Sequence, residues 1–128
     1  MDKMILAVRK AAARYADFRG RASRPEFWWC VLAIWIIGFV AQFLDRLIFG
    51  RAIGPEGFDG GPVSFLLVIL VLLPGLALAV RRLHDSGRSG WWLLLEFIPV
   101  IGWLLLLFFY VQRSDPGPNR FGPPEPFA

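Results

Sequence analysis

The chain has 128 residues, of which 56% are hydrophobic and 19% are charged, and its formal net charge is +4. A soluble domain of this size could not bury so much apolar surface in one core and would expose large apolar patches. Three apolar runs, residues 27–44, 63–80 and 91–111, account for the excess. At ~1.5 Å per residue, each run matches the thickness of a bilayer's hydrocarbon core. We therefore predict an all-α integral membrane protein, a single membrane domain over residues 1–128 with three transmembrane helices and an amphipathic N-terminal segment.

Residues 1–23 precede the first apolar run, and we predict a cytoplasmic amphipathic segment there. At helical spacing, residues 4–18 place apolar side chains on one face and charged ones on the other. The apolar face consists of Met4, Val8, Ala11, Tyr15 and Phe18. A helix of this pattern lies in the membrane interface with its basic side toward anionic headgroups. The alternative is a frayed terminus, because the apolar face is thin and rich in alanine.

The first transmembrane helix is predicted over residues 24–49. Ser23 and Glu26 have the spacing of a capping box, in which the serine hydroxyl accepts from the amide of residue 26 and the glutamate reaches back to the serine amide. Pro25 fits the first helical turn, where its missing N–H is not needed. These signals place the start of the helix near residue 24.

Glycine and proline mark the connection that follows. Residues 50–62 contain five glycines and two prolines, a composition that predicts a loop. The second transmembrane helix is predicted over residues 63–85, and Pro74 interrupts its middle. Because a proline cannot donate to the carbonyl one turn earlier, we expect a kink there.

The third transmembrane helix is predicted over residues 90–112, with Pro99 and Gly102 inside it. A segment that bends there and re-enters the same side is the alternative, but 21 apolar residues favour a full crossing. Residues 113–128 form a tail rich in proline and glycine, in which irregular structure is expected.

Lysine and arginine are distributed unevenly among the segments outside the apolar runs. Residues 1–26 carry seven and residues 81–90 carry three, whereas residues 45–62 and 112–128 carry two each. The positive-inside rule therefore predicts a multi-pass protein with its N-terminus and residues 81–90 in the cytoplasm. With three crossings, the loop and the C-terminus lie on the periplasmic side.

The densest polar cluster lies in residues 81–90, and a structural interpretation explains most of it. Arg81 and Asp85 are one helical turn apart and can form an ion pair. Gly87 can end the second helix in a left-handed conformation, and Ser89 can cap the third. The alternative is an anion site, in which three arginines bind a phosphate beside free amides at the start of the third helix. Those arginines are Arg81, Arg82 and Arg88.

His84 and Asp85 do not suggest a catalytic pair. Adjacent helical side chains point about 100° apart, and no nucleophile accompanies them. His84 is the only histidine, so the spacing of a metal site is missing as well. We expect neither enzymatic activity nor a cofactor nor a bound metal.

Glu96 is the one charged residue inside the third apolar run. An intramembrane acid costs roughly 2.5 kcal/mol or more unless it is paired, protonated or hydrated. It can join helices by pairing with Arg81, Arg82 or an arginine of residues 19–24. It can also be a proton or cation site in an oligomeric transporter. The pairing is favoured, because the arginines are predicted on the same side of the bilayer.

Several short motifs occur in a fixed order along the chain. They are Phe18-Arg19-Gly20-Arg21, Arg24 with Glu26-Phe27-Trp28, Arg81-Arg82-Leu83-His84-Asp85, Ser89-Gly90-Trp91-Trp92, and Asn119-Arg120-Phe121-Gly122-Pro123. This set resembles the domain-of-unknown-function 805 family, the YhaH-like small bacterial inner-membrane proteins. The resemblance covers about residues 15–124. It implies an inner (plasma) membrane location and a helical architecture of few spans, and it implies no activity.

The resemblance also singles out the tail motif Asn119, Arg120, Phe121 and Gly122, which the reading of the residues explains only as a turn-rich segment. With a full third crossing, this motif cannot share a site with the cluster at residues 81–85.

The function favoured by the sequence is a binding or scaffold role, in which a basic cytoplasmic surface contacts anionic lipid or a partner protein. That surface consists of Arg19, Arg21, Arg24, Arg81, Arg82 and Arg88. Expected partners are membrane lipids, with a homo-oligomer or another membrane protein as further possibilities and no nucleic acid. The alternatives are a small oligomeric transporter or channel using Glu96, and a lipid-headgroup-modifying enzyme.

Overall fold

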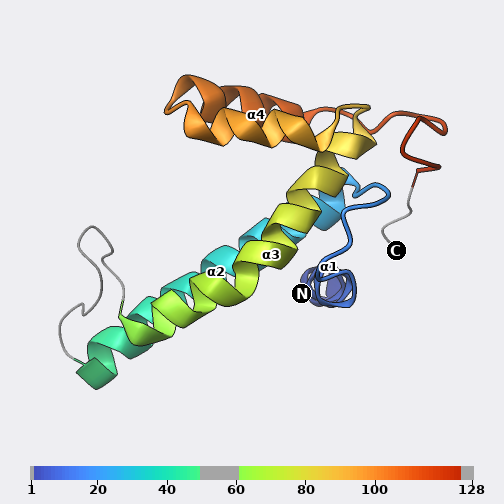
Figure 1. Ribbon diagram of the computed structural model, residues 1–128. Coiled ribbons are helices and arrows are strands. Elements are labelled where there is room, and N and C mark those ends of the chain that lie inside the picture. Colours follow the sequence, from blue (N-terminus) through green and yellow to red (C-terminus); the bar gives the residue numbers. More distant parts are fainter. Residues whose placement is uncertain (1, 50–60, 125–128) are drawn as a thin grey trace.

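A computed structural model describes residues 2–49 and 61–124, and all regular elements in these ranges are helices (Figure 1). Most of the loop predicted over residues 50–62 lies outside the described residues, as do the last four residues of the tail. The elements are α1 (Asp2–Ala13), α2 (Arg24–Phe49), α3 (Pro62–Asp85), the 3₁₀ helix η1 (Gly90–Phe97) and α4 (Ile101–Val111).

Helices α2 and α3 form a long antiparallel hairpin (Figure 1). Among the described residues, these two helices are long and apolar enough to cross a bilayer. Large apolar side chains point outward along them, including Trp35, Phe39 and Leu47 of α2 and Leu66 of α3. This arrangement suits lipid, because most backbone groups within the two helices bond internally while the apolar side chains face hydrocarbon.

Asp45 fixes the far end of this hairpin. The Asp45 carboxylate accepts hydrogen bonds from the amides of Gly61 (2.9 Å), Val63 (2.9 Å) and Ser64 (2.8 Å). These amides begin α3 and have no helical partner of their own. A Cβ atom at Gly61 would lie 2.6 Å from Asp45 Cγ, so only glycine permits this approach. The helix start is therefore capped by a side chain from α2.

The start of α2 shows part of the predicted capping box. The Glu26 amide lies 3.5 Å from the Ser23 hydroxyl, which can accept from it. The Glu26 carboxylate forms an ion pair with α3, because Glu26 Oε1 lies 3.4 Å from Arg81 Nη1.

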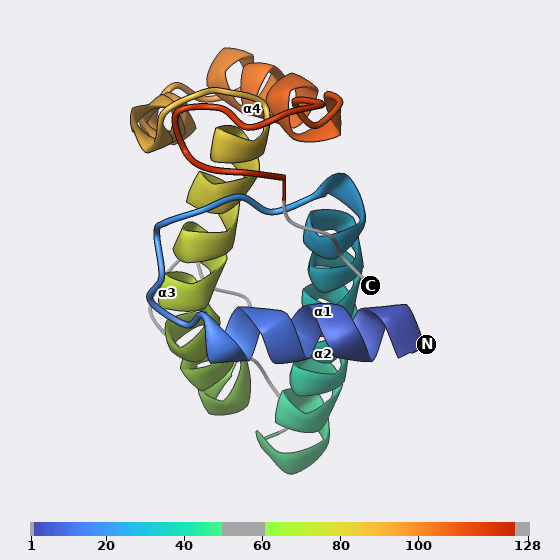
Figure 2. The same cartoon turned by 90° about the vertical axis from the view of Figure 1, so that its right-hand side faces the viewer.

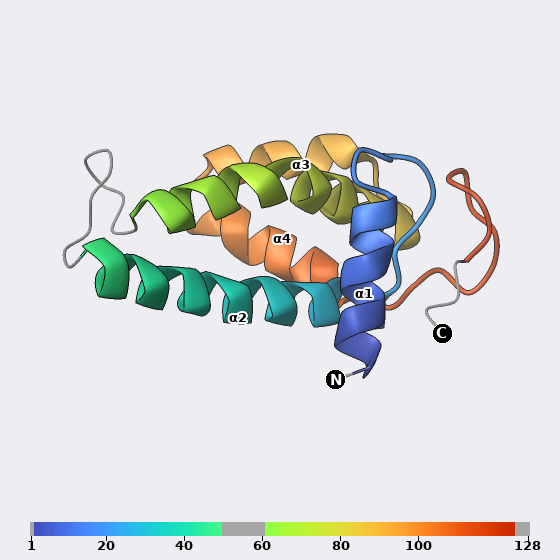
Figure 3. The same cartoon turned by 90° about the horizontal axis from the view of Figure 1, so that it is seen from below.

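The third apolar segment does not form the single helix predicted over residues 90–112. Instead, η1 and α4 lie side by side as a short hairpin (Figures 1 and 3). The chain reverses at Val100, whose φ of 64° and ψ of −67° belong to a γ-turn closed by a 2.7 Å hydrogen bond from the Ile101 amide to the Pro99 carbonyl. At ~2 Å per residue, η1 is about 16 Å long, which is half the thickness of a hydrocarbon core.

Two contacts explain why the segment folds back. A Cβ at Gly102 would lie 1.9 Å from the Leu95 carbonyl oxygen, so the glycine lets the backbones of α4 and η1 touch. The indole of Trp103 donates a 3.0 Å hydrogen bond to the Glu96 carbonyl, which the broken helix leaves without its usual partner. The chain consequently returns to the end of α3 from which η1 departed.

Helix α1 lies across α2 and α3 near that same end (Figure 2). Its buried residues are Ala7 and Ala11, whose small side chains allow close packing against the hairpin. The helix ends at Ala13, so the amphipathic helix predicted over residues 4–18 is shorter than expected. The remaining residues, 14–23, form an irregular connection with turns that passes over the end of α3 (Figure 2).

Candidate functional site

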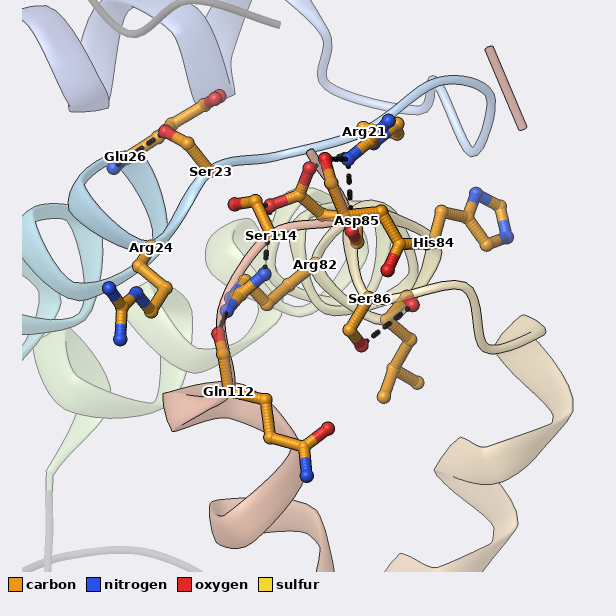
Figure 4. Close-up of polar contacts among 12 residues, drawn as sticks. Arg21, Ser23, Arg24, Glu26, Arg82, His84, Asp85, Ser86, Gln112 and Ser114 are labelled. Carbon is orange, nitrogen blue, oxygen red and sulfur yellow. Dashed lines mark hydrogen bonds and ion pairs between the residues drawn. The ribbon is translucent and has the colours of Figure 1, made fainter. Parts of the chain in front are cut away.

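Five charged side chains are buried where α2, α3 and the tail come together, and Figure 4 labels four of them: Arg21, Glu26, Arg82 and Asp85. We name them the buried charge cluster; they are Arg21, Glu26, Arg81, Arg82 and Asp85. Each is at most 1% exposed. Charged residues are almost never fully buried unless they are paired, so the partners of each group define what the cluster does.

Asp85 is the centre of the cluster. Its Oδ1 lies 2.8 Å from Arg21 Nε, and its Oδ2 lies 3.0 Å from Arg82 Nη1. The hydroxyl of Ser114 donates to the same Oδ2. One carboxylate thereby joins the connection before α2, the last turn of α3 and the tail.

Arg21 holds the tail through main-chain carbonyls. Its Nη1 donates to the carbonyls of Gly117 (2.9 Å) and Gly122 (3.3 Å), and its Nη2 donates to those of Asp115 (2.7 Å) and Asp85 (3.0 Å). A guanidinium has five N–H donors and no acceptor, which suits it to gather several carbonyls at once. The backbone adds a 2.8 Å bond from the Asp115 amide to the Asp85 carbonyl.

Arg82 completes the end of α4 in the same way. It donates to the carbonyl of Tyr110 at 3.0 Å and to that of Gln112. The last carbonyls of a helix have no intrahelical donor, so an arginine from a neighbouring helix satisfies them. Arg82 thus attaches the η1–α4 hairpin to the long hairpin.

The tail motif lies directly on the end of α3. The His84 ring stacks on the ring of Phe121, with centroids 3.8 Å apart and planes 4° apart. Asn119 donates to the His84 carbonyl and to the Asp115 carboxylate, both at 2.9 Å. The separation expected between the tail motif and the cluster at residues 81–85 is therefore wrong, because the folded-back third segment brings them together.

Several expectations for residues 81–90 are also resolved. Arg81 reaches Glu26 rather than the predicted Asp85. Gly87 has the left-handed φ of 83° predicted for the end of α3, whereas the Ser89 side chain makes no capping hydrogen bond. Arg88 lies partly exposed, 2.7 Å from Gln112 Oε1 and over the Phe109 ring.

These placements separate the residues of the predicted basic surface into two groups. Arg21, Arg81 and Arg82 point into the protein and contact carboxylates and carbonyls. Arg19 and Arg24 are exposed and Arg88 is partly exposed. Figure 4 shows Arg24 apart from the Asp85 carboxylate. Two tail arginines, Arg113 and Arg120, are also exposed. Of the three arginines of the alternative anion site, Arg81 contacts Glu26, whereas Arg82 and Arg88 both contact Gln112, Arg82 at its carbonyl and Arg88 at its side chain.

Glu96 is exposed on η1, away from the arginines expected to hold it. The sequence predicted a pairing with Arg81, Arg82 or residues 19–24, but the buried carboxylates Glu26 and Asp85 occupy that role. Glu96 does not pair as expected because the chain reverses at Val100. This reversal makes η1 a short helix and leaves the Glu96 side chain outside the cluster.

The exposed connection after α1 has its own polar structure. Arg14 Nε lies 3.0 Å from Asp17 Oδ2, and the Arg19 amide donates to Asp17 Oδ1 at 2.9 Å. The hydrogen bond from the Arg19 amide lowers the pKa of Asp17, although partial burial acts in the opposite direction. Asp17 therefore remains ionised to a lower pH than a free aspartate does.

No metal-binding chemistry is evident in the described part of the chain, residues 2–49 and 61–124. There, no three His, Cys, Asp or Glu side chains gather closely enough to hold an ion. The His84 Nδ1 lies 3.0 Å from the Gly20 carbonyl, and Figure 4 shows its ring directed away from the Asp85 carboxylate.

Sequence reasoning missed Asp45, Ser114 and Asp115. Asp45 is the last acidic residue of α2 and looks like an ordinary helix end. Ser114 and Asp115 lie in a segment treated as irregular. Their partners are distant in sequence, so local spacing carried no signal for them.

Two long apolar helices, a short apolar hairpin and a tail docked on a buried charge cluster define a small helical membrane protein. Residues 15–123 match the family described as "Protein of unknown function (DUF805)", and the chain belongs to this family.

The inner membrane protein YhaH of Escherichia coli strain K12 is 45% identical over 114 residues, covering 89% of this chain and 91% of that protein. The inner membrane protein YhaI of the same strain is 41% identical, covering 84% and 85%. The uncharacterized protein YiiR is 37% identical over 70% of this chain and 53% of its own length. No solved structure matches the chain significantly.

These relatives confirm the family resemblance and the membrane character predicted from the three apolar runs. The chain is a bacterial integral inner-membrane protein of unknown activity.

Proposed function

We propose that the protein binds anionic lipid headgroups through its exposed arginines at the end of the hairpin where the tail docks. The observation that carries this proposal is the division of the arginines into two groups. The buried group fixes the shape of this end, while Arg19, Arg24, Arg113 and Arg120 remain exposed around it. Each basic residue near an anionic membrane surface contributes about 1 kcal/mol of attraction.

The charge distribution supports a topology in which α2 and α3 cross the membrane and the η1–α4 hairpin enters from the cytoplasmic side and returns. In this topology the N-terminal segment, residues 81–90 and the tail share one side. That side then carries twelve of the 14 lysines and arginines, and the opposite side carries Arg46 and Arg51. The bias is stronger than with three crossings, which favours a cytoplasmic C-terminus.

A hollow of about 560 Å³ beside Arg24 supports headgroup binding at this end. Trp28 and Trp29 line it, and Val111 closes it from the side of α4. Tryptophan is enriched at the boundary between hydrocarbon and headgroups, where a phosphate would lie within reach of an arginine.

Native mass spectrometry of the full chain tests the proposal directly. We expect the protein to retain phosphatidylglycerol in preference to phosphatidylcholine, and the triple variant Arg24→Gln, Arg113→Gln, Arg120→Gln to lose about 100-fold in affinity for the anionic lipid. Arg46→Gln is the matched control, because Arg46 is exposed at the opposite end of α2. An unchanged preference in the triple variant would overturn the proposal.

Paired reporters fused after Ala128 test the topology. A reporter active in the cytoplasm should give a signal, and one active in the periplasm should not. The opposite result would mean three full crossings, with the tail separated from the buried charge cluster in the membrane.

A transporter is the second candidate, favoured by the exposed position of Glu96 near the turn of the η1–α4 hairpin. An intramembrane acid is by default a candidate functional group. Ion or proton flux into vesicles that Glu96→Gln abolishes would support this candidate over lipid binding. The proposal assigns no catalytic step. The Asp85 carboxylate is held by Arg21, Arg82 and Ser114, and His84 Nδ1 lies against the Gly20 carbonyl.

A further inference from the structure

An apolar groove of about 280 Å³ lies where α1 crosses the long hairpin. Ala11 and Ala12 form its wall on α1, Ile34 and Ile37 on α2, and Val71 and Gly75 on α3. The groove exists because the α1 side chains are small and because α3 has no side chain at residue 75. A Cβ atom at Gly75 would meet no atom within 4 Å.

A second, polar hollow of about 560 Å³ borders the first. It follows the connection after α1, from Ala13 to Arg19, and Tyr15 lines both hollows. Arg14 and Asp17 pair within it, so their charges balance. The exposed guanidinium of Arg19 adds a net positive charge to the polar hollow.

The apolar groove and the polar hollow together form an amphipathic site. Atoms beside an empty space lose their dispersion contacts, so an apolar hollow that adjoins hydrocarbon fills with hydrocarbon. An acyl chain fits the apolar groove, and a negative headgroup fits the positive charge at its polar end. Arg24 and its two tryptophans lie at a different place, between α2 and α4, so this groove is distinct from that hollow.

We propose that one acyl chain of an anionic phospholipid occupies the groove between α1, α2 and α3, with its headgroup beside Arg19. The inference deepens the proposed function and rests on it for the preference for anionic lipid. It adds a defined chain-binding position, in which α1 acts as the cover of the groove.

Photo-crosslinking with phosphatidylglycerol that carries a diazirine in its acyl chain tests the inference in the full-length protein. Crosslinks mapped by mass spectrometry should concentrate on Ile34, Ile37 and Val71. Gly75→Leu places a side chain in the groove and should remove most of these crosslinks. Gly38→Leu is the matched control, because a Cβ at Gly38 also meets nothing within 4 Å but Gly38 does not line the groove. Unchanged melting temperatures would show that both variants fold.

The headgroup is tested separately with Arg19→Gln. This substitution keeps the backbone bonds of Arg19 and should lower groove crosslinking by phosphatidylglycerol about fivefold, the effect of one basic residue at a membrane surface. Crosslinking by the matching phosphatidylcholine probe should not change.

The outcomes separate the two proposals. Crosslinks spread evenly over the outer faces of α2 and α3 and unaffected by Gly75→Leu would overturn the groove, while the Arg24, Arg113 and Arg120 effect could still hold. Conversely, crosslinks within the groove that are equal for both lipids and indifferent to Arg19→Gln would overturn the headgroup assignment, leaving an apolar chain site without charge recognition.

Discussion

His84 and Phe121 stack face to face, with ring centroids 3.8 Å apart, although His84 lies in the last turn of α3 and Phe121 lies in the tail. Arg120 lies over the Phe121 ring, with its guanidinium carbon 4.7 Å from the ring centroid. The Phe121 amide is also held at 2.9 Å by the Asn119 side chain. The Phe121 ring therefore attaches the tail to the end of the long hairpin.

Removing that ring should release part of the tail. Aromatic stacking contributes about 0.5–1.5 kcal/mol beyond burial, so Phe121→Ala should raise the rate of protease cleavage within residues 113–124 about 2- to 10-fold. Phe121→Tyr keeps the ring and should protect the tail as the unmodified chain does. Equal cleavage of the alanine variant and the unmodified protein would show that the stack does not hold the tail.

Asp85→Ala should be the most destabilising substitution in the buried charge cluster. The substitution leaves Arg21 and Arg82 buried without the carboxylate that pairs with them, and breaking a buried ion pair costs about 3–5 kcal/mol. Thermal melting in detergent measures the loss. Asp17→Ala is the comparison, because its pair with Arg14 is partly exposed and is worth under about 1 kcal/mol. A similar loss for both would contradict the central role of Asp85.

Gly102→Ala should weaken the η1–α4 hairpin. Its Cβ would collide with the Leu95 carbonyl, and overpacking of this kind costs about 1–3 kcal/mol. Gly117→Ala serves as the control, since a Cβ there meets nothing within 4 Å. We expect a lower melting temperature and a more protease-sensitive tail for the first variant only. If Gly102→Ala is as stable as the control, the two backbones do not approach as the structure shows.

Asp45 should matter at the opposite end of the molecule. Asp45→Ala removes the acceptor for three amides that begin α3, and loss of a helix cap costs about 0.5–2 kcal/mol. Asp45→Asn keeps one side-chain oxygen and should lose less, chiefly the favourable interaction of a negative charge with the helix start. Melting curves that rank asparagine below alanine would argue against this capping.

The long hairpin could be predicted from the sequence because the features that mark its two helices are local. Apolar length marked α2 and α3, Ser23 and Pro25 marked the first start, and Gly87 marked the end of α3. The third segment was not accessible in this way. Its apolar run of 21 residues fits either one crossing or a folded pair of helices, and Gly102 decides between them only through contact with the Leu95 backbone.

The buried charge cluster could be predicted from the sequence only in part. Arg81, Arg82 and Asp85 were identified as one polar cluster and Arg21 as part of a basic surface, but their partners depended on the path of the tail. Once the third segment reverses, Ser114 reaches Asp85 and Arg21 reaches the tail, so that three arginines of the predicted basic surface lie in the interior. Spacing along α3 alone suggested the pairing of Arg81 with Asp85, which the structure replaces with a contact to Glu26.

Within the described part of the tail, residues 113–124, Arg21 donates its hydrogen bonds to carbonyl oxygens, those of Asp115, Gly117 and Gly122. Every amino acid supplies a carbonyl, so this contact depends on the path of the chain and not on the side chains along it. Exchanges at the exposed Pro116 and Pro118 that preserve the path should be tolerated. Adding or deleting one residue between 115 and 122 would move the carbonyls out of reach, so the length of this tail is under tighter constraint than its composition.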